Sequence, residues 1–423
     1  MDTNAGPGPR YRWPILSVSV LIVFAALGLS RFSYTSILPS MKDALDLSNT
    51  QAGGLATANL AGYMAMGIVG GALASRFGPR RIITVGLLLA CLGMVVTGFA
   101  TDYGMAFGGR FVSGIGAAAS NVPAHGMIGL WFSQRRRGIA TGTTATGASI
   151  GLVAVGPLVP FIIRTYGESG WRLAWFILAA VVAVVAVISY AVMRDKPGYR
   201  PEDHGPAPVR QRGDWRRIYL SGKVWHLGAV YFMFGFAYMA YMTFFVQRLK
   251  TDAGYTAESA GRMFMILGLA SLACGFIWGF VADWIGRKQA MVTILAVQAV
   301  AYAIFALWTG TTAVLISAVM FGLTAWGIPA IMAVVSADLV GPQMAAAVYG
   351  FLTAFHGFGQ AAGPYVAGKL ADIMPTFRTS YLMAAGVALL GAIVLSLLRW
   401  AVPVRKPAPA PSYMAAPGEA RLD

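Results

Sequence analysis

Three arginines lie within long apolar stretches of this sequence, at Arg31, Arg110 and Arg262. A charge placed in hydrocarbon is energetically costly, so an ionisable residue inside a membrane segment is a candidate for function. We expect all sixteen Asp and Glu residues to lie outside the deep interior. A guanidinium without a carboxylate partner offers a rigid fork of donors that suits a carboxylate or a sulfonate. Arginines in the apolar stretches without acidic partners therefore predict contact with an anion.

Arg31 and Arg110 are the two main candidates for that contact. Arg31 precedes Tyr34 and Thr35, which makes a polar cluster about two turns from the end of its apolar stretch. The alternative for Arg31 is an interfacial side chain that extends to the lipid headgroups. The alternative for Arg110 is a structural role in which it binds nearby carbonyl groups. Arg262 begins its stretch, and we expect it to extend to the headgroups.

Further polar residues could complete a substrate site. Asn121 lies in the same stretch as Arg110, and Tyr238 and Tyr241 are spaced to share one helical face, with packing as the alternative. His125 and His356 are candidates for proton coupling, because histidine exchanges protons near neutral pH. The alternative for each histidine is a hydrogen bond between helices. Two separated histidines, without Cys or Asp pairs, predict no metal site, and we expect no cofactor.

Composition sets the kind of element that carries these residues. Apolar residues make up 57% of the 423 residues and charged residues only 11%, far from a typical soluble domain. Apolar blocks of about 20 residues match the thickness of a bilayer core. We expect an all-α membrane protein with twelve transmembrane helices. The expected helices are 15–39, 51–74, 82–100, 105–131, 138–163, 172–193, 223–246, 257–282, 289–308, 313–337, 346–369 and 380–400.

Polar breaks and basic residues predict the domain organisation. We expect a cytoplasmic segment 1–14, a six-helix half 15–193, a cytoplasmic linker 194–222, a second half 223–402 and a disordered tail 403–423. Most Lys and Arg fall in loops on one side of this map, so the positive-inside rule places both termini in the cytoplasm. The net charge of +16 is located in these loops and not on a soluble face. We therefore expect a lipid bilayer around a monomer and no nucleic-acid partner.

An internal repeat relates the two halves. Gly53 and Gly261 are 208 positions apart, as are Ser75 and Asp283 in two similar turns. Repeats at a fixed offset along the chain indicate duplication. Two parallel six-helix halves form a transporter architecture whose site lies at their interface.

The two turns carry a resemblance to a known family. Gly279-Phe-Val-Ala-Asp283-Trp-Ile-Gly286-Arg287-Lys288 resembles the G-x-x-x-D-R-x-G-R-R turn of the major facilitator superfamily, and the turn from Gly71 to Arg81 is a second copy. The resemblance implies that the turns gate the cytoplasmic side, where the acidic residue joins a charge network. Ser75 replaces that acid in the first copy, but it could still cap a helix end. The gating residues implied by the resemblance are Arg76, Gly78, Arg80, Asp283, Gly286 and Arg287.

Other segments narrow the resemblance. Arg31-Phe32-Ser33-Tyr34 and Gly170-Trp171-Arg172 resemble bacterial monocarboxylate-porter-like members. Many of those members bind a substrate carboxylate with an arginine in helix 8, and Phe276 occupies the corresponding place. A lactate-type substrate therefore does not follow from the resemblance.

The chemistry and the resemblance together predict a secondary or facilitative transporter. We expect it to move a small organic anion, with a carboxylate as the favoured class, across a bacterial inner membrane by alternating access. The alternative is efflux of amphipathic compounds or drugs, although the interior lacks the acidic residue expected for a cationic drug. An enzyme would need a nucleophile–base set or a metal cluster, and the sequence shows neither.

Overall fold

The computed structural model describes residues 11–195, 220–340, 344–374 and 376–398. Residues 1–10, most of the expected linker and the expected tail 403–423 lie outside the described residues. The described chain is helical and contains no strand. Its first helices are α1 (Arg12–Val23), the π-helix η2 (Phe24–Phe32), α2 (Ser33–Ala44), α3 (Asn49–Phe77), α4 (Pro79–Phe99), α5 (Tyr103–Trp131), α6 (Gln134–Tyr166), the short η3 (Gly167–Ser169) and α7 (Gly170–Val192). The later helices are α9 (Gly222–Thr251), α10 (Ala257–Ile285), α11 (Arg287–Leu307), α12 (Thr311–Thr324), α13 (Gly327–Val340), α14 (Ala345–Ile373) and α15 (Arg378–Leu397).

Length and hydropathy identify eight membrane-spanning candidates among the described residues, or nine if the bent pair Asn49–Gly67 and Val69–Phe77 forms one span. The twelve expected segments all overlap helices. Two of these helices, α5 and α14, are rich in glycine and polar residues, which lowers their hydropathy. A count of twelve spans therefore remains a prediction.

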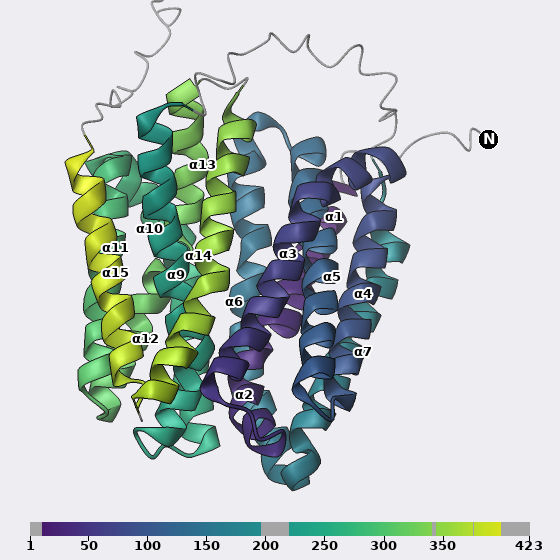
Figure 1. The fold of residues 1–423 in the computed structure, drawn as a ribbon. Helices are drawn as coiled ribbons and strands as arrows, with labels where there is room; N and C mark the ends of the chain where they lie inside the picture. Colours follow the sequence, from purple (N-terminus) through teal and green to yellow (C-terminus); the bar gives the residue numbers. More distant parts are fainter. Residues whose placement is uncertain (1–10, 196–219, 341–343, 375, 399–423) are drawn as a thin grey trace, which may run out of the picture.

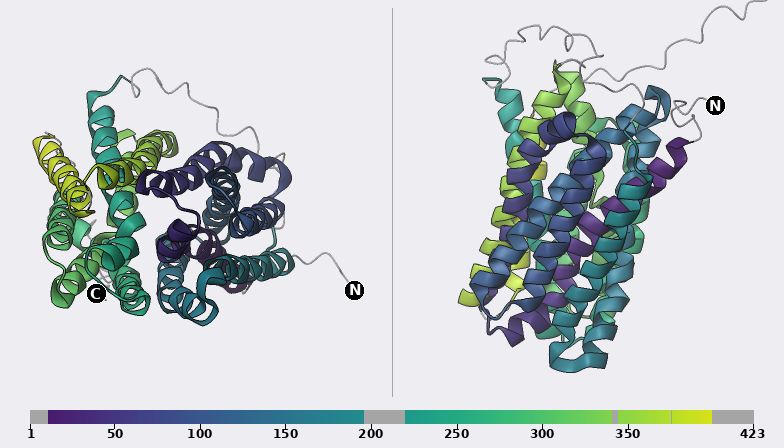
Figure 2. Two further views of the ribbon diagram at one scale, coloured as in Figure 1. Left: turned by 60° about the horizontal axis from the view of Figure 1, so that its bottom comes forward. Right: turned by 90° about the vertical axis from the view of Figure 1, so that its right-hand side faces the viewer.

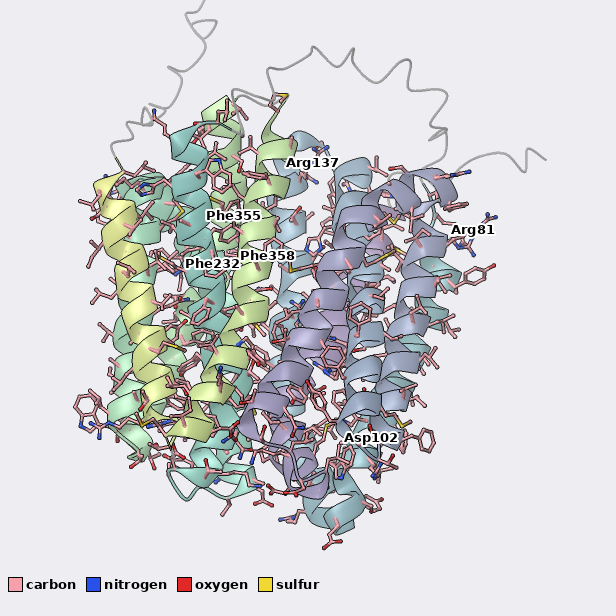
Figure 3. The ribbon with its side chains drawn as sticks, in the orientation of Figure 1. Arg81, Asp102, Arg137, Phe232, Phe355 and Phe358 are labelled. Carbon is pink, nitrogen blue, oxygen red and sulfur yellow. The ribbon has the colours of Figure 1, made fainter. Side chains whose placement is uncertain are left out.

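The helices form two groups that lie side by side (Figures 1 and 2). We call α1 to α7 the N-terminal bundle and α9 to α15 the C-terminal bundle. Helix α3 packs against α14, α6 against α10, and α2 against α9. We call the end where α1 begins and α15 ends the terminal end, and the opposite end the distal end. Figure 3 shows Arg81 and Arg137 at the terminal end and Asp102 at the distal end.

The sequence repeat creates two equivalent contacts between the bundles. A Cβ added at Gly53 in α3 would lie 2.2 Å from the carbonyl oxygen of Pro364 in α14. A Cβ added at Gly261 in α10 would lie 2.2 Å from the carbonyl oxygen of Gly156 in α6. Gly53 and Gly261 are 208 positions apart, and so are Gly156 and Pro364. Small residues allow helices to approach this closely, so the duplicated sequence forms two interfaces of the same kind.

The bundles contact each other at the distal end and in the centre, and they separate toward the terminal end. Along α3 and α14, the Thr57 hydroxyl donates to the Ala361 carbonyl at 2.6 Å. Nearer the terminal end, a Cβ at Gly357 would still touch Met64. Further along these helices, a Cβ would meet no atom within 4 Å at Gly67, Gly71 and Gly350. The α3–α14 pair is therefore closed distally and open terminally.

The two repeated turns hold their bundles in a related way. Gly78 and Gly286 precede helices with φ of 88° and 91°, a backbone region that favours glycine. After Gly78, the Arg80 Nε donates to the Tyr190 carbonyl at 2.8 Å. After Gly286, the Lys288 Nζ donates to the carbonyl of Ser396 at 2.7 Å. Each turn is thus tied to the last helix of its own bundle.

The charged groups of the turns differ between the copies. In the C-terminal bundle, Arg287 forms an ion pair with Asp338 at the end of α13. In the N-terminal bundle, Asp195 accepts a hydrogen bond from the Arg80 backbone N–H at 3.3 Å. The expectation that Ser75 caps a helix end is wrong, because its hydroxyl donates back to the Gly71 carbonyl inside α3 at 2.9 Å. A short hydroxyl side chain within a helix readily forms this bond to the preceding turn.

Candidate functional site

Arg31 is the central charged group of the candidate site. It lies at the end of η2 and is 8% exposed. Its Nε donates to the Asn59 Oδ1 at 3.4 Å, and its guanidinium lies 4.3 Å from the centre of the Tyr63 ring. Its Nη2 is buried without a hydrogen-bond partner, and Arg31 has no ion pair among the described residues. A buried donor without a partner is costly, so this guanidinium is available for an anion.

Groups from the C-terminal bundle surround the same region. Tyr238 in α9 and His356 in α14 are close enough to interact electrostatically with Arg31. The neighbouring Phe32 ring lies 5.7 Å from that of Trp326, between α12 and α13. Arg31 therefore lies where the two bundles meet.

Trp326 joins the bundles at this level. Its ring is 5.9 Å from Tyr238, and its indole Nε1 donates to the Ser149 hydroxyl of α6 at 3.1 Å. Ser271 of α10 donates to the same hydroxyl at 2.8 Å. Sequence reasoning missed Trp326, although the Gly327 and Pro329 that follow it are signals for a helix break.

The structure places Arg110 behind Arg31. Arg110 is 1% exposed, and its Nη1 donates to the Ser30 carbonyl at 2.8 Å. Its guanidinium lies over the Tyr34 and Trp175 rings, at 4.7 and 5.3 Å from their centres. The geometry thus favours the structural alternative for Arg110 over direct contact with an anion.

Tyr34 and Thr35 are both engaged in bonds to the backbone. The Tyr34 hydroxyl donates to the Ala52 carbonyl at 2.6 Å, within the N-terminal bundle. The Thr35 hydroxyl donates to the Met242 carbonyl of α9 at 3.0 Å. Tyr34 therefore fixes a local contact, whereas Thr35 helps to close the distal half of the interface.

Asn121 and Tyr238 lie in the surroundings of Arg31, whereas Tyr241 lies within the C-terminal bundle. The Asn121 Nδ2 donates to the Tyr63 hydroxyl at 2.7 Å, and its Oδ1 is buried without a partner. Tyr241 is fully buried in the aromatic core of the C-terminal bundle and shares a hydrogen bond of 2.8 Å with Ser317. Both tyrosine rings lie near Phe321, with centres 5.9 Å away for Tyr238 and 4.5 Å away for Tyr241. A role for either tyrosine in binding a substrate stays a prediction.

The two histidines have different surroundings. The His125 Nδ1 is 3.1 Å from the Asn121 carbonyl oxygen. The His356 ring stacks on Tyr231 with centres 4.3 Å apart, and its Nε2 is 2.9 Å from the Gln360 amide nitrogen. Each histidine thus has a polar partner one turn away in its own helix, and the stacking of His356 on Tyr231 is the contact that joins two helices. A role in proton coupling stays a prediction.

Arg248 is a buried cation that sequence reasoning placed in a loop. Helix α9 continues to Thr251, several residues beyond its expected end, so Arg248 lies inside the bundle and is 2% exposed. Its Nη2 donates to the Ala306 carbonyl at 2.9 Å, and its guanidinium lies 4.6 Å from the Phe305 ring centre. The run of polar residues, a conventional signal for a loop, was misleading because Gln247 and Arg248 at its start are buried in the bundle.

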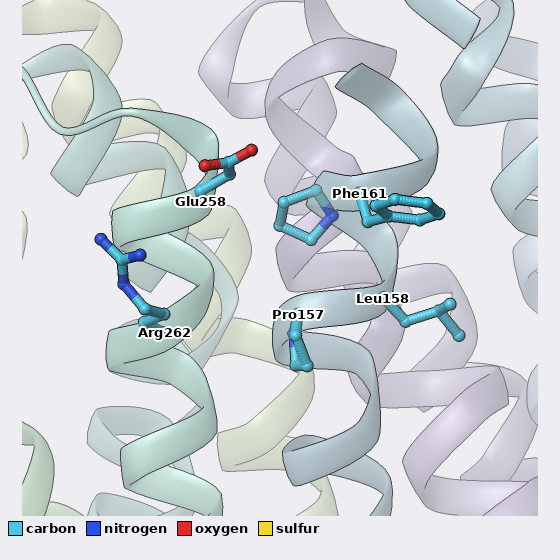
Figure 4. A pocket seen from close by; sticks show the side chains of 6 residues that line it. Pro157, Leu158, Phe161, Glu258 and Arg262 are labelled. Atoms are coloured by element: carbon cyan, nitrogen blue, oxygen red, sulfur yellow. The ribbon is translucent and has the colours of Figure 1, made fainter. Parts of the chain in front are cut away.

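Arg262 lies apart from the central site. It borders a groove of about 520 Å³ between α6 and α10, opposite Pro157, Leu158 and Phe161 (Figure 4). Nearby, Arg164 and Glu258 form an ion pair of 2.6 Å across the bundles. Arg262 is exposed, and its location near the headgroups stays a prediction. Within the described ranges, no group of three or more His, Cys, Asp or Glu residues could hold a metal ion.

Comparison with known proteins identifies relatives among membrane transporters. The chain is 27% identical to the probable sulfoacetate transporter SauU of Cupriavidus necator over 66% of this chain and 66% of that protein. It is 26% identical to the hexuronate transporter of Bacillus subtilis, over 89% of this chain and 92% of that protein. It is 23% identical to human monocarboxylate transporter 2, over 93% and 86% of the two chains.

A solved structure supports the fold at lower sequence identity. The crystal structure of a bacterial homologue of the human lysosomal transporter Spinster matches with a TM-score of 0.72 and 19% identity. The match covers 92% of this chain and 96% of that chain. The two chains therefore share a fold.

A family model provides the final comparison. The model described as "Uncharacterised MFS-type transporter YbfB" matches residues 23–396. That range includes Arg31, both repeated turns and all the helices that contact each other across the bundles. The chain therefore belongs to this family of MFS-type transporters, which makes it a multi-pass membrane transporter.

Proposed function

We propose that this protein is a secondary or facilitative transporter that moves a small organic anion across a bacterial inner membrane by alternating access. The observation that carries the proposal is the buried Nη2 of Arg31, which has no hydrogen-bond partner and no acidic residue to pair with. An anion would satisfy this donor. The similar transporters named for sulfoacetate, hexuronate and monocarboxylates support the same class of cargo.

The site that we propose has one guanidinium fork and aromatic walls. Arg31 would bind the carboxylate or sulfonate group, with Asn121 and Tyr238 close by. Arg110 bonds to backbone carbonyls through Nη1 and Nη2, and only its Nε is unpartnered, so Arg31 is the arginine that we propose for the anion contact. Trp326, Tyr63 and Tyr238 would surround the rest of the cargo. A compact anion with one anionic group in contact with Arg31 fits this arrangement.

We also propose twelve spans in two halves, 15–193 and 223–402, joined by the cytoplasmic linker 194–222. The paired contacts of Gly53 and Gly261 support the duplication. The terminal end would be cytoplasmic, since it carries Arg81 and Arg137 (Figure 3). The structure would then represent a state that is closed to the periplasm and open to the cytoplasm.

Proton coupling through His356 or His125 is a further part of the proposal. His356 is the stronger candidate because it lies within electrostatic range of Arg31. A proton on its ring would change the field that the anion experiences. We expect His356→Gln to abolish proton-driven accumulation in proteoliposomes while exchange of anions across the membrane continues. Accumulation equal to that of the wild type would contradict the role of His356, and His125→Gln provides the parallel test.

A thermal-shift screen of the purified protein tests the proposed cargo. The probes are pyruvate, benzoate and methanesulfonate as anions, and tetraphenylphosphonium as a lipophilic cation. A ligand that binds the folded state raises its apparent stability. We expect stabilisation by anions. Stabilisation by the lipophilic cation alone would overturn the proposal and favour the alternative function, efflux of amphipathic compounds.

A further inference from the structure

The helix that carries Arg31 has an unusual winding. Residues Phe24–Phe32 form a π-helix of nine residues between α1 and α2. Such helices are rare, normally occur as single turns, and are frequent at functional sites. The return to α-helical winding at Ser33 disturbs the regular pattern of backbone hydrogen bonds, so carbonyl groups near this point need other donors. Arg31 lies directly at this transition.

Side chains donate to three successive carbonyl groups at this transition. The Ser33 hydroxyl donates to the Leu29 carbonyl at 2.5 Å. Arg110 of α5 donates from Nη1 to the Ser30 carbonyl at 2.8 Å and from Nη2 to the Arg31 carbonyl at 3.5 Å. The guanidinium of Arg110 thus spans the end of the π-helix and bonds to the backbone of Arg31 itself.

Arg110 is itself held in a rigid frame. Its guanidinium lies close to the Tyr34 and Trp175 rings. Its own carbonyl accepts a hydrogen bond of 3.2 Å from the Asn59 Nδ2. Asn59 is the residue whose Oδ1 accepts from the Arg31 Nε at 3.4 Å. Arg110 therefore reaches Arg31 by two routes, directly through the backbone and indirectly through Asn59.

The contact between α3 and α5 allows little adjustment of this frame. A Cβ at Gly114 would lie 1.9 Å from the Asn59 carbonyl oxygen. The Asn59 Nδ2 also donates to the Ser113 hydroxyl at 2.9 Å. Movement of Asn59 would break contacts on both helices. The frame thus fixes one side of the Arg31 side chain and leaves the Nη2 side unbonded.

We propose that Arg110 is a positioning residue for anion binding, which acts by clamping the carbonyl groups at the end of the π-helix so that Arg31 presents its free donors to the anion. This inference rests on the proposed function, in which Arg31 contacts the anion. A planar guanidinium suits the clamp because it can reach two successive carbonyls while it lies close to two aromatic rings. Lysine would keep the charge but offer a single ammonium group.

A double-mutant cycle tests this inference. We expect Arg110→Lys to weaken binding of pyruvate, benzoate or methanesulfonate by at least tenfold in wild-type background, measured by thermal-shift titration. In an Arg31→Gln background, Arg110→Lys should have no further effect on anion affinity, because Arg110 acts through Arg31. Additive losses would mean that Arg110 contacts the anion independently, and they would overturn the inference.

Arg248→Lys is the matched control. Arg248 is also a buried arginine that donates to a carbonyl and lies close to two aromatic rings, but it lies in the C-terminal bundle. Both substitutions should lower the melting temperature of the free protein, and only Arg110→Lys should weaken anion binding. An equal loss of affinity in both variants would show a general structural effect and refute a positioning role.

A second variant keeps the test decisive if Arg110→Lys does not fold. Ser33→Ala removes the donor to the Leu29 carbonyl, the third carbonyl at the π-helix end. We expect it to weaken anion binding severalfold, again without effect in the Arg31→Gln background. If Arg31→Gln binds anions normally, the proposed function fails. If Arg31→Gln loses binding while Arg110→Lys and Ser33→Ala retain it, only the present inference fails.

Discussion

Replacement of Arg31 by glutamine should affect stability and binding in opposite directions. Glutamine retains an amide that can bond to Asn59, but it removes the charge and the free Nη2 donor. In the empty protein this donor is buried without a partner, which costs about 1–3 kcal/mol. We therefore expect the free Arg31→Gln protein to be as stable as the wild type or more stable. Functional sites often sacrifice stability in this way.

The loss of binding can be estimated from the same contacts. The Arg31 Nε is bonded to Asn59, so the anion would be bound by the remaining Nη groups. One hydrogen bond to a charged group contributes about 1.5–3 kcal/mol. Since each 1.4 kcal/mol changes affinity about tenfold, loss of one such bond should weaken anion binding roughly 10- to 100-fold. Loss of both bonds would have a larger effect.

Thermal-shift titration and uptake by proteoliposomes measure the two effects separately. The melting temperature without ligand reports the cost of the unpaired donor, and its rise with pyruvate, benzoate or methanesulfonate reports anion binding. Arg262→Gln is the matched control, because it makes the same charge change at an exposed residue outside the central site. We expect this control to bind and transport like the wild type.

Two results would refute the reasoning about Arg31. Wild-type affinity and uptake in Arg31→Gln would show that Arg31 does not bind the cargo. Equal loss in Arg31→Gln and Arg262→Gln would show that overall charge, and not the buried donor, controls binding.

Three further substitutions test the gate and the core. Asp372→Ala removes the carboxylate that accepts hydrogen bonds of 2.8 and 2.7 Å from backbone N–H groups at the start of α3. Cysteines introduced at the distal end should then react faster with a labelling reagent. An unchanged labelling rate would contradict the role of this contact as a gate. Gly261→Ala adds a Cβ within 2.2 Å of the facing backbone and should raise distal accessibility and reduce transport, whereas Gly275→Ala, which meets no atom within 4 Å, should do neither. Tyr241→Phe removes the hydrogen bond to Ser317 and should lower the free energy of unfolding by about 1 kcal/mol, with anion affinity unchanged. A loss of anion affinity would show that Tyr241 is part of the binding site.

The gate predictions share one physical basis. The distal contact is formed by backbone atoms at van der Waals distance and by a carboxylate at a helix N-terminus, where the helix dipole favours a negative charge. Alternating access requires these contacts to break and others to form at the terminal end. The open positions at Gly67, Gly71 and Gly350 are suited to that second set of contacts.

Several features of this protein follow from the sequence alone. Apolar block length, the 208-residue offset between Gly53 and Gly261, and the turn around Asp283 were sufficient to predict a helical major facilitator transporter. These signals are local or periodic, so they can be recognised without knowledge of the tertiary structure. The lack of acidic residues in the apolar stretches likewise indicated an anion as the cargo.

Only the tertiary structure shows how the donors of the two buried arginines Arg31 and Arg110 are used. Arg31 and Arg110 are equivalent in sequence terms, since each is a cation in an apolar stretch. They differ because Arg110 bonds through Nη1 and Nη2 to carbonyl groups of another helix, 80 positions away from Ser30, and leaves only its Nε unpaired. The Nη2 of Arg31 reaches no acceptor. The π-helix that creates this arrangement has no simple signal in the residues Phe24–Phe32. A long-range contact and a local change of winding thus distinguish Arg31, the proposed binding residue, from Arg110, its proposed positioning residue. Neither feature is encoded in the residue type.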